Sequence, residues 1–371
     1  MRLLVAASPG EVRVAAWQPP DGLFDYSIWR PGAPDGVGDL HRGRVVARAP
    51  AMAGAFLALD GADGFLPDSE GGAAAGDGLF LTVRITRAAQ GGKGPRLTAR
   101  LSDAERALVG SGPPALLRRG PDAVQRLAAL YSDAPVIVDD PALEALLRPA
   151  LGARLTHGKT FDDAVEAAVA ELAEPTVDLP GGARLSVYPT PALTALDVDL
   201  AGASADRRGK RAAQLAANTA LLPALARQIR LRNLAGAILV DLAGLPAKRR
   251  AALGPAFAAA LAADPLRPRF LGFTALGLAE ILRPRIHPPL HELLAGPHAA
   301  GLVALRRAAA EIAARPERAL RLWAAPAVAT ALRADPMALV DLARRAGRPL
   351  IICDDRAAAP VGWRLEEVSV G

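Results

Sequence analysis

Two aspartates in this sequence stand where their carboxylates could share one metal ion. Asp197 lies in the apolar stretch 193–200, and Asp241 lies near the end of a similar stretch, 238–242. If both stretches are strands of one sheet, the side chains face one cleft at comparable depth. Paired carboxylates suit a hard cation such as Mg²⁺ or Mn²⁺, which keeps some waters and also binds phosphate. The pair therefore predicts phosphodiester cleavage, although an acidic residue at a strand end can also form a turn or cap a helix.

The segment between the two aspartates has the pattern of a helix. Residues 205–233 repeat apolar positions at helical spacing and contain no glycine after Gly209. With the flanking stretches they predict a strand, helix, strand unit. Three cations at the start of this helix would lie beside the carboxylates, where they could hold a phosphate backbone without reading bases. A solvated helix start is the alternative. These cations are Arg207, Arg208 and Lys210.

An earlier part of the chain has the pattern of a small closed barrel. Short strand-like stretches at 39–49, 54–59, 64–67 and 79–86 are evenly spaced and separated by glycine turns. Such barrels bind single strands by stacking bases on exposed aromatic rings in a basic groove. The aromatic and basic candidates for that contact are Phe56, Phe65, Arg44 and Lys93. For the two phenylalanines, packing in the barrel core is the alternative.

The two ends of the chain also have regular patterns. Near the N-terminus, the stretches 2–7, 11–17 and 23–28 read as strands, and we expect them to join the sheet that carries the aspartates, with the barrel inserted between. Residues 300–371 predict a small α/β unit. Its helices are expected at 300–313 and 336–346, and its strands at 320–324, 350–353 and 363–368.

Composition narrows the class of protein. A chain of 371 residues can hold two or three domains and bury a substantial core. No apolar run is long enough to span a membrane and the N-terminus lacks a signal-peptide pattern, so we expect a soluble cytoplasmic protein. The single cysteine, Cys353, excludes an internal disulfide and a multi-cysteine zinc site. A net charge of +6 is compatible with a nucleic-acid partner, but the excess of arginine and alanine also fits a genome-wide composition bias.

Several motifs together resemble the ribonuclease E/G family. They are LTALDV at 193–198, ARQIRLRNLAG at 226–236, ILVD at 238–241 and GFTALGLAEILRPR at 272–285. The resemblance implies a metal-dependent endoribonuclease in which Asp197 and Asp241 hold the catalytic Mg²⁺. The stretches GRV at 43–45, AFL at 55–57, GFLP at 64–67 and QGGKGPRLT at 90–98 are similar to the family's S1 domain, which has the oligonucleotide-binding (OB) fold. In that family, the positions of Phe56, Phe65 and Lys93 touch RNA.

The sequence also departs from the family pattern. Asp199 stands where the family commonly has asparagine; this extra carboxylate could join the metal site or raise the pKa of a neighbour. Pro191 replaces an acidic residue, and no stretch after Leu101 resembles the family's sensor of 5′-monophosphates. In place of the cysteine zinc link the chain has His287 and His291, separated by two prolines and a leucine, so we expect no zinc.

These observations predict an α/β (α+β) protein with a ribonuclease-H-like catalytic core, an inserted S1 barrel and a small C-terminal domain. The preferred function is metal-dependent hydrolysis of single-stranded RNA, in RNA processing or decay and possibly rRNA maturation. An RNA-binding protein of the same fold with weak or lost turnover is the alternative, and an unrelated basic scaffold is the third. A homodimer through the C-terminal domain is also expected. The predicted ranges are 1–35 for the N-terminal strands of the core, 36–101 for the barrel, 102–290 for the core and 291–371 for the small domain.

Overall fold

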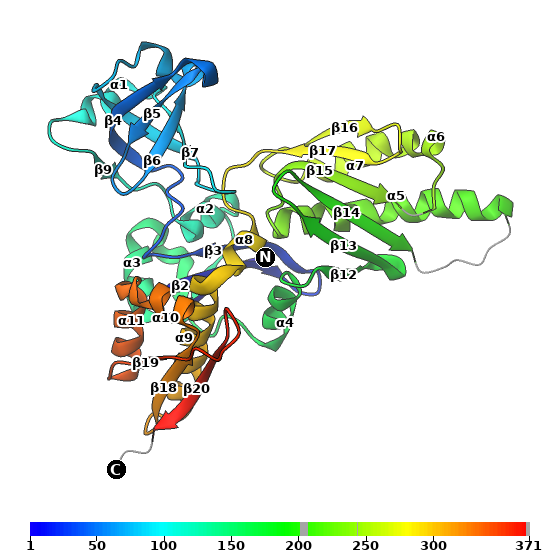
Figure 1. Ribbon diagram of the computed structural model, residues 1–371. Coiled ribbons are helices and arrows are strands. Elements are labelled where there is room, and N and C mark those ends of the chain that lie inside the picture. The colour runs from blue at the N-terminus through cyan, green and yellow to red at the C-terminus, as the bar shows by residue number, and fades with distance from the viewer. Residues whose placement is uncertain (201–206, 243, 369–371) are drawn as a thin grey trace. The chain divides into compact units, whose positions relative to one another are not determined.

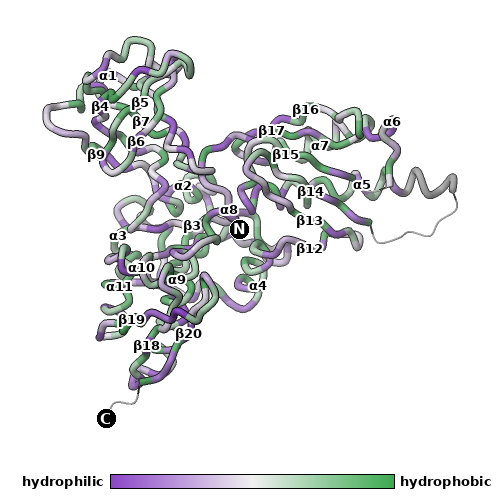
Figure 2. Tube along the Cα trace, viewed as in Figure 1, coloured by the Kyte–Doolittle hydropathy of each residue, from purple (hydrophilic) through white to green (hydrophobic). Residues whose placement is uncertain are grey.

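The computed structural model of the protein forms two compact units. It describes residues 1–200, 207–242 and 244–368, apart from the side chains of residues 207–213 and 247–248. One unit contains Met1–Val165 with Glu292–Gly371, and the other contains Glu166–His291. Figure 1 labels the elements of both. No helix in these ranges is long and apolar enough to cross a membrane, and hydrophobic and hydrophilic residues are interspersed along the chain (Figure 2).

The N-terminal strands form a sheet of their own. Leu3 of β1 lies opposite Val136 of β10 in a parallel pair, while the other edge of β1 pairs with β2. The sheet has the order β11-β10-β1-β2-β3, and helices α2 and α3 contribute to its core. The prediction that these strands join the sheet of the aspartates is therefore wrong. A buried strand pattern specifies which faces are covered but does not specify the neighbouring strand. The elements are β1 (Arg2–Ser8), β2 (Glu11–Gln18), β3 (Gly22–Trp29), α2 (Ala123–Leu130), β10 (Val136–Val138), α3 (Pro141–Leu151) and β11 (Leu155–His157).

A closed five-stranded barrel follows in the chain, as in an OB-fold. Closure occurs because β4 pairs with both β5 and β7, so that the order β5-β6-β8-β7-β4 returns to its start. Val45, Leu57 and Leu97 are among the buried side chains of its interior. Strand β9 pairs with β4 outside this ring. The elements are β4 (Leu40–Ala49), β5 (Gly54–Ala58), β6 (Asp63–Pro67), β7 (Phe80–Arg87), β8 (Arg96–Thr98), α1 (Asp103–Arg106) and β9 (Ala115–Arg118).

The C-terminal part is a three-stranded sheet covered on one face by helices. Strand β18 is central, parallel to β19 and antiparallel to β20. Leu322 and Ala324 of β18 are buried against α9 and α10, within one hydrophobic cluster. The helices and strands expected from the sequence are present at these positions. The elements are α9 (Gly296–Ala314), β18 (Ala319–Ala324), α10 (Pro326–Arg333), α11 (Pro336–Ala346), β19 (Ile351–Asp354) and β20 (Trp363–Val368).

The second unit is built on a six-stranded mixed sheet that carries the aspartates. Its order is β12-β13-β14-β15-β17-β16. Alternate residues of β14 are buried, and Leu196 and Val198 pack with Leu225 and Ile229 of α5. Helix α5 thus covers one face of the sheet. The elements in or next to this unit are α4 (Asp163–Glu171), β12 (Thr176–Leu179), β13 (Ala183–Pro189), β14 (Leu193–Leu200), α5 (Arg207–Leu231), β15 (Gly236–Leu242), α6 (Ala247–Arg250), α7 (Gly254–Leu261), β16 (Arg269–Phe273), β17 (Ala279–Arg283) and α8 (Leu290–Leu294).

Candidate functional site

Asp197 and Asp241 lie directly opposite each other on neighbouring strands. Strands β14 and β15 are parallel, and their register pairs these two residues. Each aspartate is flanked along its strand by buried residues, Leu196 and Val198 in β14 and Val240 and Leu242 in β15. Because side chains alternate between the faces of a strand, both carboxylates project from the face opposite α5. The strand, helix, strand unit predicted from the sequence is thus confirmed, and it brings the two acids together.

Asp199 adds a third negative charge to the same face. It lies two residues beyond Asp197 on β14 and is exposed, whereas Asp197 is partly buried. Partial burial raises the pKa of Asp197, and the nearby charges of Asp199 and Asp241 raise it further. Excess negative charge at this place would be relieved by a cation.

One cation of the chain already contacts this cluster. Arg250 of α6 donates from Nη1 to Asp241 Oδ1 at 2.7 Å, and its side chain is 12% exposed against 53% for Asp241. The same guanidinium donates to the carbonyl oxygens of Leu245 and Gly277, each at 2.8 Å. Two backbone contacts therefore hold Arg250 in place independently of the aspartate. The basic residues at 248–250 do not by themselves predict this pairing, because it depends on the path of the chain after β15.

The described acidic side chains do not by themselves complete the coordination shell of a metal ion. Among the residues described, no group of three or more histidine, cysteine, aspartate or glutamate side chains is arranged to hold a metal ion. The paired carboxylates of Asp197 and Asp241 do suit a cation that takes one or two protein carboxylates and completes its shell with water and phosphate, as Mg²⁺ does. The basic run at the start of α5 cannot be placed beside them, because the side chains of Arg207, Arg208 and Lys210 lie outside the described residues.

An exposed tyrosine, not identified from the sequence, shares the face of the aspartates. Tyr188 of β13 lies opposite Ala195, and Ser186 lies opposite Asp197. The tyrosine side chain is 55% exposed. In the sequence, Tyr188 follows Ser186 by two residues within a strand pattern. This spacing puts both side chains on one face and could have identified the tyrosine.

Comparison with known proteins finds similar sequences for the region that holds these residues. Residues 154–286, which include both aspartates, match the family model described as the ribonuclease E/G family. Ribonuclease E of Nostoc sp. is 34% identical over 199 residues, which make up 48% of this chain and 29% of that protein.

Other curated relatives match in the same way. Ribonuclease E of Synechocystis sp. is 32% identical over 203 residues, 50% of this chain and 30% of the relative. Ribonuclease G of Escherichia coli (strain K12) is 33% identical over 132 residues, 35% of this chain and 27% of the relative. The matched parts thus span less than a third of the length of each of these three ribonucleases.

Several residues in the motifs quoted above hold the matched region together. Arg283 is buried, donating from Nε to Asp264 Oδ2 and from Nη1 to Asn233 Oδ1, at 2.7 and 2.6 Å. Arg232 donates to the carbonyl oxygens of Leu172 and Glu174 at 3.0 and 2.6 Å. These side chains join the ends of α4, α5 and β17. Both arginines therefore contribute to the packing around the sheet that carries the aspartates.

The aromatic residues predicted to bind RNA lie on the surface of the barrel. Phe56 is 39% exposed, and its ring centroid is 5.3 Å from that of Phe65, its cross-strand partner. A Cβ atom at Gly54 would lie 2.4 Å from the Phe65 ring, so glycine is needed there. Arg44 and Lys93 are both exposed. The structure thus favours a surface role for the two rings over the alternative of core packing.

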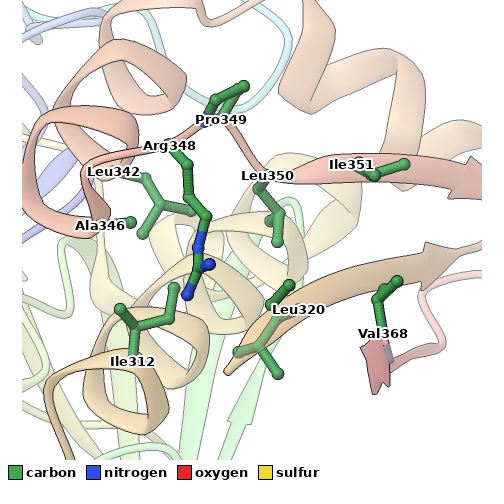
Figure 3. Close-up of a pocket in the computed structure, with 10 residues that line it drawn as sticks. Ile312, Leu320, Leu342, Ala346, Arg348, Pro349, Leu350, Ile351 and Val368 are labelled. Carbon is green, nitrogen blue, oxygen red and sulfur yellow. The ribbon is translucent and has the colours of Figure 1, made fainter. Parts of the chain in front are cut away.

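A small cavity in the C-terminal part has no such chemistry. Its volume is about 110 Å³, below the roughly 300–1,000 Å³ usual for small-molecule sites. Figure 3 shows Arg348 extending between Leu342 and Ile312. Arg348 Nη2 donates to the carbonyl oxygen of Pro316 at 2.8 Å. The cavity is lined by Ile312, Ala319, Leu320, Leu342, Ala346, Arg348, Pro349, Leu350, Ile351 and Val368. With mainly apolar walls and its single guanidinium engaged by the backbone, it fits imperfect packing rather than a substrate site.

Proposed function

We propose that this protein is an endoribonuclease that hydrolyses single-stranded RNA with Asp197 and Asp241 as ligands of a divalent cation, Mg²⁺ or Mn²⁺. The observation that carries the proposal is the register of β14 and β15, which pairs the two carboxylates on the face opposite α5. The ribonuclease E and G relatives support the choice of RNA as substrate. By this family likeness, water adds to phosphorus and the P–O3′ bond breaks, so the products carry 5′-phosphate and 3′-hydroxyl ends.

The residues present fit such a cation. Burial is the main cause of the raised pKa of Asp197, and the charges of Asp199 and Asp241 raise it further; a cation would offset the charge of these carboxylates. A bound divalent cation supplies a Lewis acid that offsets charge on the phosphate and eases deprotonation of water. Asp199 lies on the same face, and its negative charge adds to the electrostatic attraction for the cation.

Other groups of the chain would hold the RNA. Phe56 and Phe65 offer rings on which bases can stack, and Arg44 and Lys93 offer charge to the phosphates. Arg207, Arg208 and Lys210 belong to the proposal as phosphate contacts near the active site. A homodimer through residues 291–371, a cytoplasmic location and a role in rRNA maturation stay predictions. So does the ribonuclease-H-like description of the core, on which the catalytic proposal does not depend.

Cleavage of an end-labelled, A/U-rich single-stranded RNA tests the proposal. We expect wild type to cut with Mg²⁺ or Mn²⁺, and Asp197→Asn and Asp241→Asn to bind this RNA without cutting it. Asp178→Asn is the matched control, because Asp178 is an exposed carboxylate on the edge strand β12 whose ion pair with Arg184 is a surface pair of small energetic value. Cleavage that survives both active-site substitutions would refute the assignment.

An RNA-binding protein with weak or lost turnover is the second candidate. The ion pair between Arg250 and Asp241 favours it, because a built-in cation already partly neutralises one proposed ligand. The departures at Pro191 and Asp199 point the same way. Both candidates predict RNA binding, so metal-dependent cleavage separates them: wild type that binds the RNA but never cuts it would establish the second.

A further inference from the structure

The second face of the C-terminal sheet carries an aromatic ring close to two arginines. Helices α9 and α10 pack on the face that holds Leu320 and Leu322. The side chains that alternate with these along β18 are Arg321 and Trp323, which lie opposite Glu366 and Arg364 of β20. We call these four residues the tryptophan platform.

The platform is accessible at its edges. The side chain of Arg364 is 57% exposed and forms a surface ion pair with Asp355 at 3.5 Å. Ile351, which lies opposite Arg321 on β19, is 51% exposed. Glu366 is exposed and Trp323 is partly exposed. A sheet face of this kind, with an aromatic residue on its central strand, can receive a flat ligand.

The contacts within the platform orient the indole ring. Trp323 Nε1 donates to a carboxylate oxygen of Glu366, which fixes the ring across the strands. The Arg364 guanidinium carbon lies 5.1 Å from the ring centroid and that of Arg321 lies 5.8 Å away. The Nε of Arg321 is buried and has no hydrogen-bond partner among the described atoms. The indole ring thus lies close to two guanidinium groups.

We propose that the tryptophan platform is a second binding site for single-stranded RNA, in which a base stacks on Trp323 and Arg321 and Arg364 contact the adjoining phosphates. Open sheets that present aromatic side chains are a recurring way to bind unpaired bases. Stacking is tolerant of sequence, and flanking guanidinium groups add both charge and cation–π attraction. The choice of RNA rests on the proposed function, but the site does not depend on catalysis.

Charge argues against a second copy of the chain as the occupant. In a two-fold symmetric dimer through this face, the same patch would meet itself. Arg321 and Arg364 would then face the same arginines of the other copy, with Glu366 and Asp355, the ion-pair partner of Arg364, as the nearby carboxylates. The pair of Arg364 with Asp355 is a surface pair of small energetic value, so the phosphates of a polyanion can replace it. The homodimer proposed above would have to use another part of residues 291–371.

Binding measurements on a protein that carries Asp197→Asn and Asp241→Asn test this site apart from cleavage. A fluorescein-labelled single-stranded RNA is titrated and its anisotropy followed. We expect Trp323→Ala to weaken binding about 5- to 100-fold, the range for loss of one stacked base. Trp323→Phe should retain part of the affinity because it keeps a ring. Arg364→Gln should weaken binding without affecting folding, because this side chain is largely exposed.

Arg333→Gln is the matched control. Arg333 lies on α10, pairs with Asp354 at 3.0 Å and is 49% exposed, so its loss removes one charge of the same domain outside the platform. Trp323→Ala and Arg364→Gln binding RNA as tightly as this control would overturn the proposal. The proposal would also be overturned if the wild type were a dimer in solution and either variant were a monomer with unchanged RNA affinity. A second copy of the chain would then be the occupant of the platform. Failure of wild type to cut RNA would instead count against the proposed function alone.

Discussion

Oδ1 of Asp241 is engaged by Arg250, and this contact shapes what the proposed site can do. The arginine is fixed by the carbonyl oxygens of Leu245 and Gly277, so it holds the carboxylate in one orientation. The other carboxylate oxygen remains for a cation. Side chains that orient a metal ligand in this way commonly matter nearly as much as the ligand.

Replacement of Arg250 by glutamine should therefore impair cleavage. We expect activity or metal affinity to fall about 10- to 100-fold, because Asp241 loses the contact that orients it. Activity titrated against Mg²⁺ measures the effect, and Arg249→Gln, at an exposed neighbouring position of α6, is the control. Unchanged or raised activity of Arg250→Gln would mean that the arginine only competes with the cation.

Tyr188 is placed to hold a base beside the aspartates. Its ring is exposed on the same face, one cross-strand pair away from Asp197 and Ser186. We expect Tyr188→Ala to raise the KM for RNA about 5- to 100-fold with little change in kcat, and Tyr188→Phe to behave as wild type, because stacking needs the ring and not the hydroxyl. Steady-state cleavage kinetics of the three proteins measure this. An unchanged KM in Tyr188→Ala would remove the tyrosine from the RNA path.

At the scale of elements, a buried ion pair stabilises the sheet that carries the aspartates. Arg283 of β17 and Asp264, which follows α7, are 4% and 5% exposed and lie 2.7 Å apart. Loss of one partner of such a pair leaves an uncompensated buried charge. The pair thus fixes β17 beside β15, which carries Asp241.

Truncation of that arginine should loosen the whole unit. Arg283→Ala is expected to lower the local free energy of unfolding by about 3–5 kcal/mol. Hydrogen exchange of the amides in β15 and β17 measures this change within the unit. Arg269→Ala, an exposed arginine on the neighbouring β16, should leave exchange as in wild type. Equal protection in both variants would contradict a role for the pair.

A second ionic contact ties α1 to the barrel and predicts a pH dependence. Glu105 accepts hydrogen bonds from Arg84 of β7 and Arg118 of β9, each at 2.6 Å. These contacts lower the pKa of Glu105 from 4.5 to about 2, and the hydrogen bond from Arg84 has the largest effect. The folded state thus binds fewer protons than the unfolded state between these pH values. The stabilisation is therefore complete above pH 4.5 and is lost as pH falls toward 2.

Comparison of wild type with Glu105→Gln checks this dependence. The variant should have the lower thermal midpoint near neutral pH, and the difference between the two proteins should shrink as pH falls from about 5 toward 2. Circular dichroism scans at several pH values measure the midpoints. A difference that is constant with pH would show that the carboxylate charge contributes nothing.

For the whole molecule, the number of phosphates that the chain contacts sets how RNA binding responds to salt. The net charge is +6, and for single strands the slope of log affinity against log salt is about −0.7 for each phosphate contacted. Substitution of both Arg321 and Arg364 by glutamine should reduce the slope by about 1.4, since two proposed phosphate contacts are lost. Titrations at several salt concentrations measure it. A slope unchanged from wild type would mean that neither arginine meets a phosphate.

The sequence by itself determined where most strands and helices lie and which residues alternate with the buried ones. Period-two burial along 193–200 and 238–242 was enough to predict that Asp197 and Asp241 share a face, because the intervening helix makes the two strands parallel neighbours. The glycine-separated strands of the barrel were predictable for a similar reason: local turn chemistry specifies strand ends.

Only the tertiary structure decided which strands far apart in the chain are neighbours and which distant side chains meet. The N-terminal strands pair with residues 136–138, and β18 brings Trp323 beside Arg364. Arg250 reaches Asp241 because α6 folds back after β15. A burial pattern records that a face is covered, but contacts between residues far apart in the chain depend on the packing of whole elements. Local sequence therefore located the acids, and tertiary packing supplied the arginine that orients one of them.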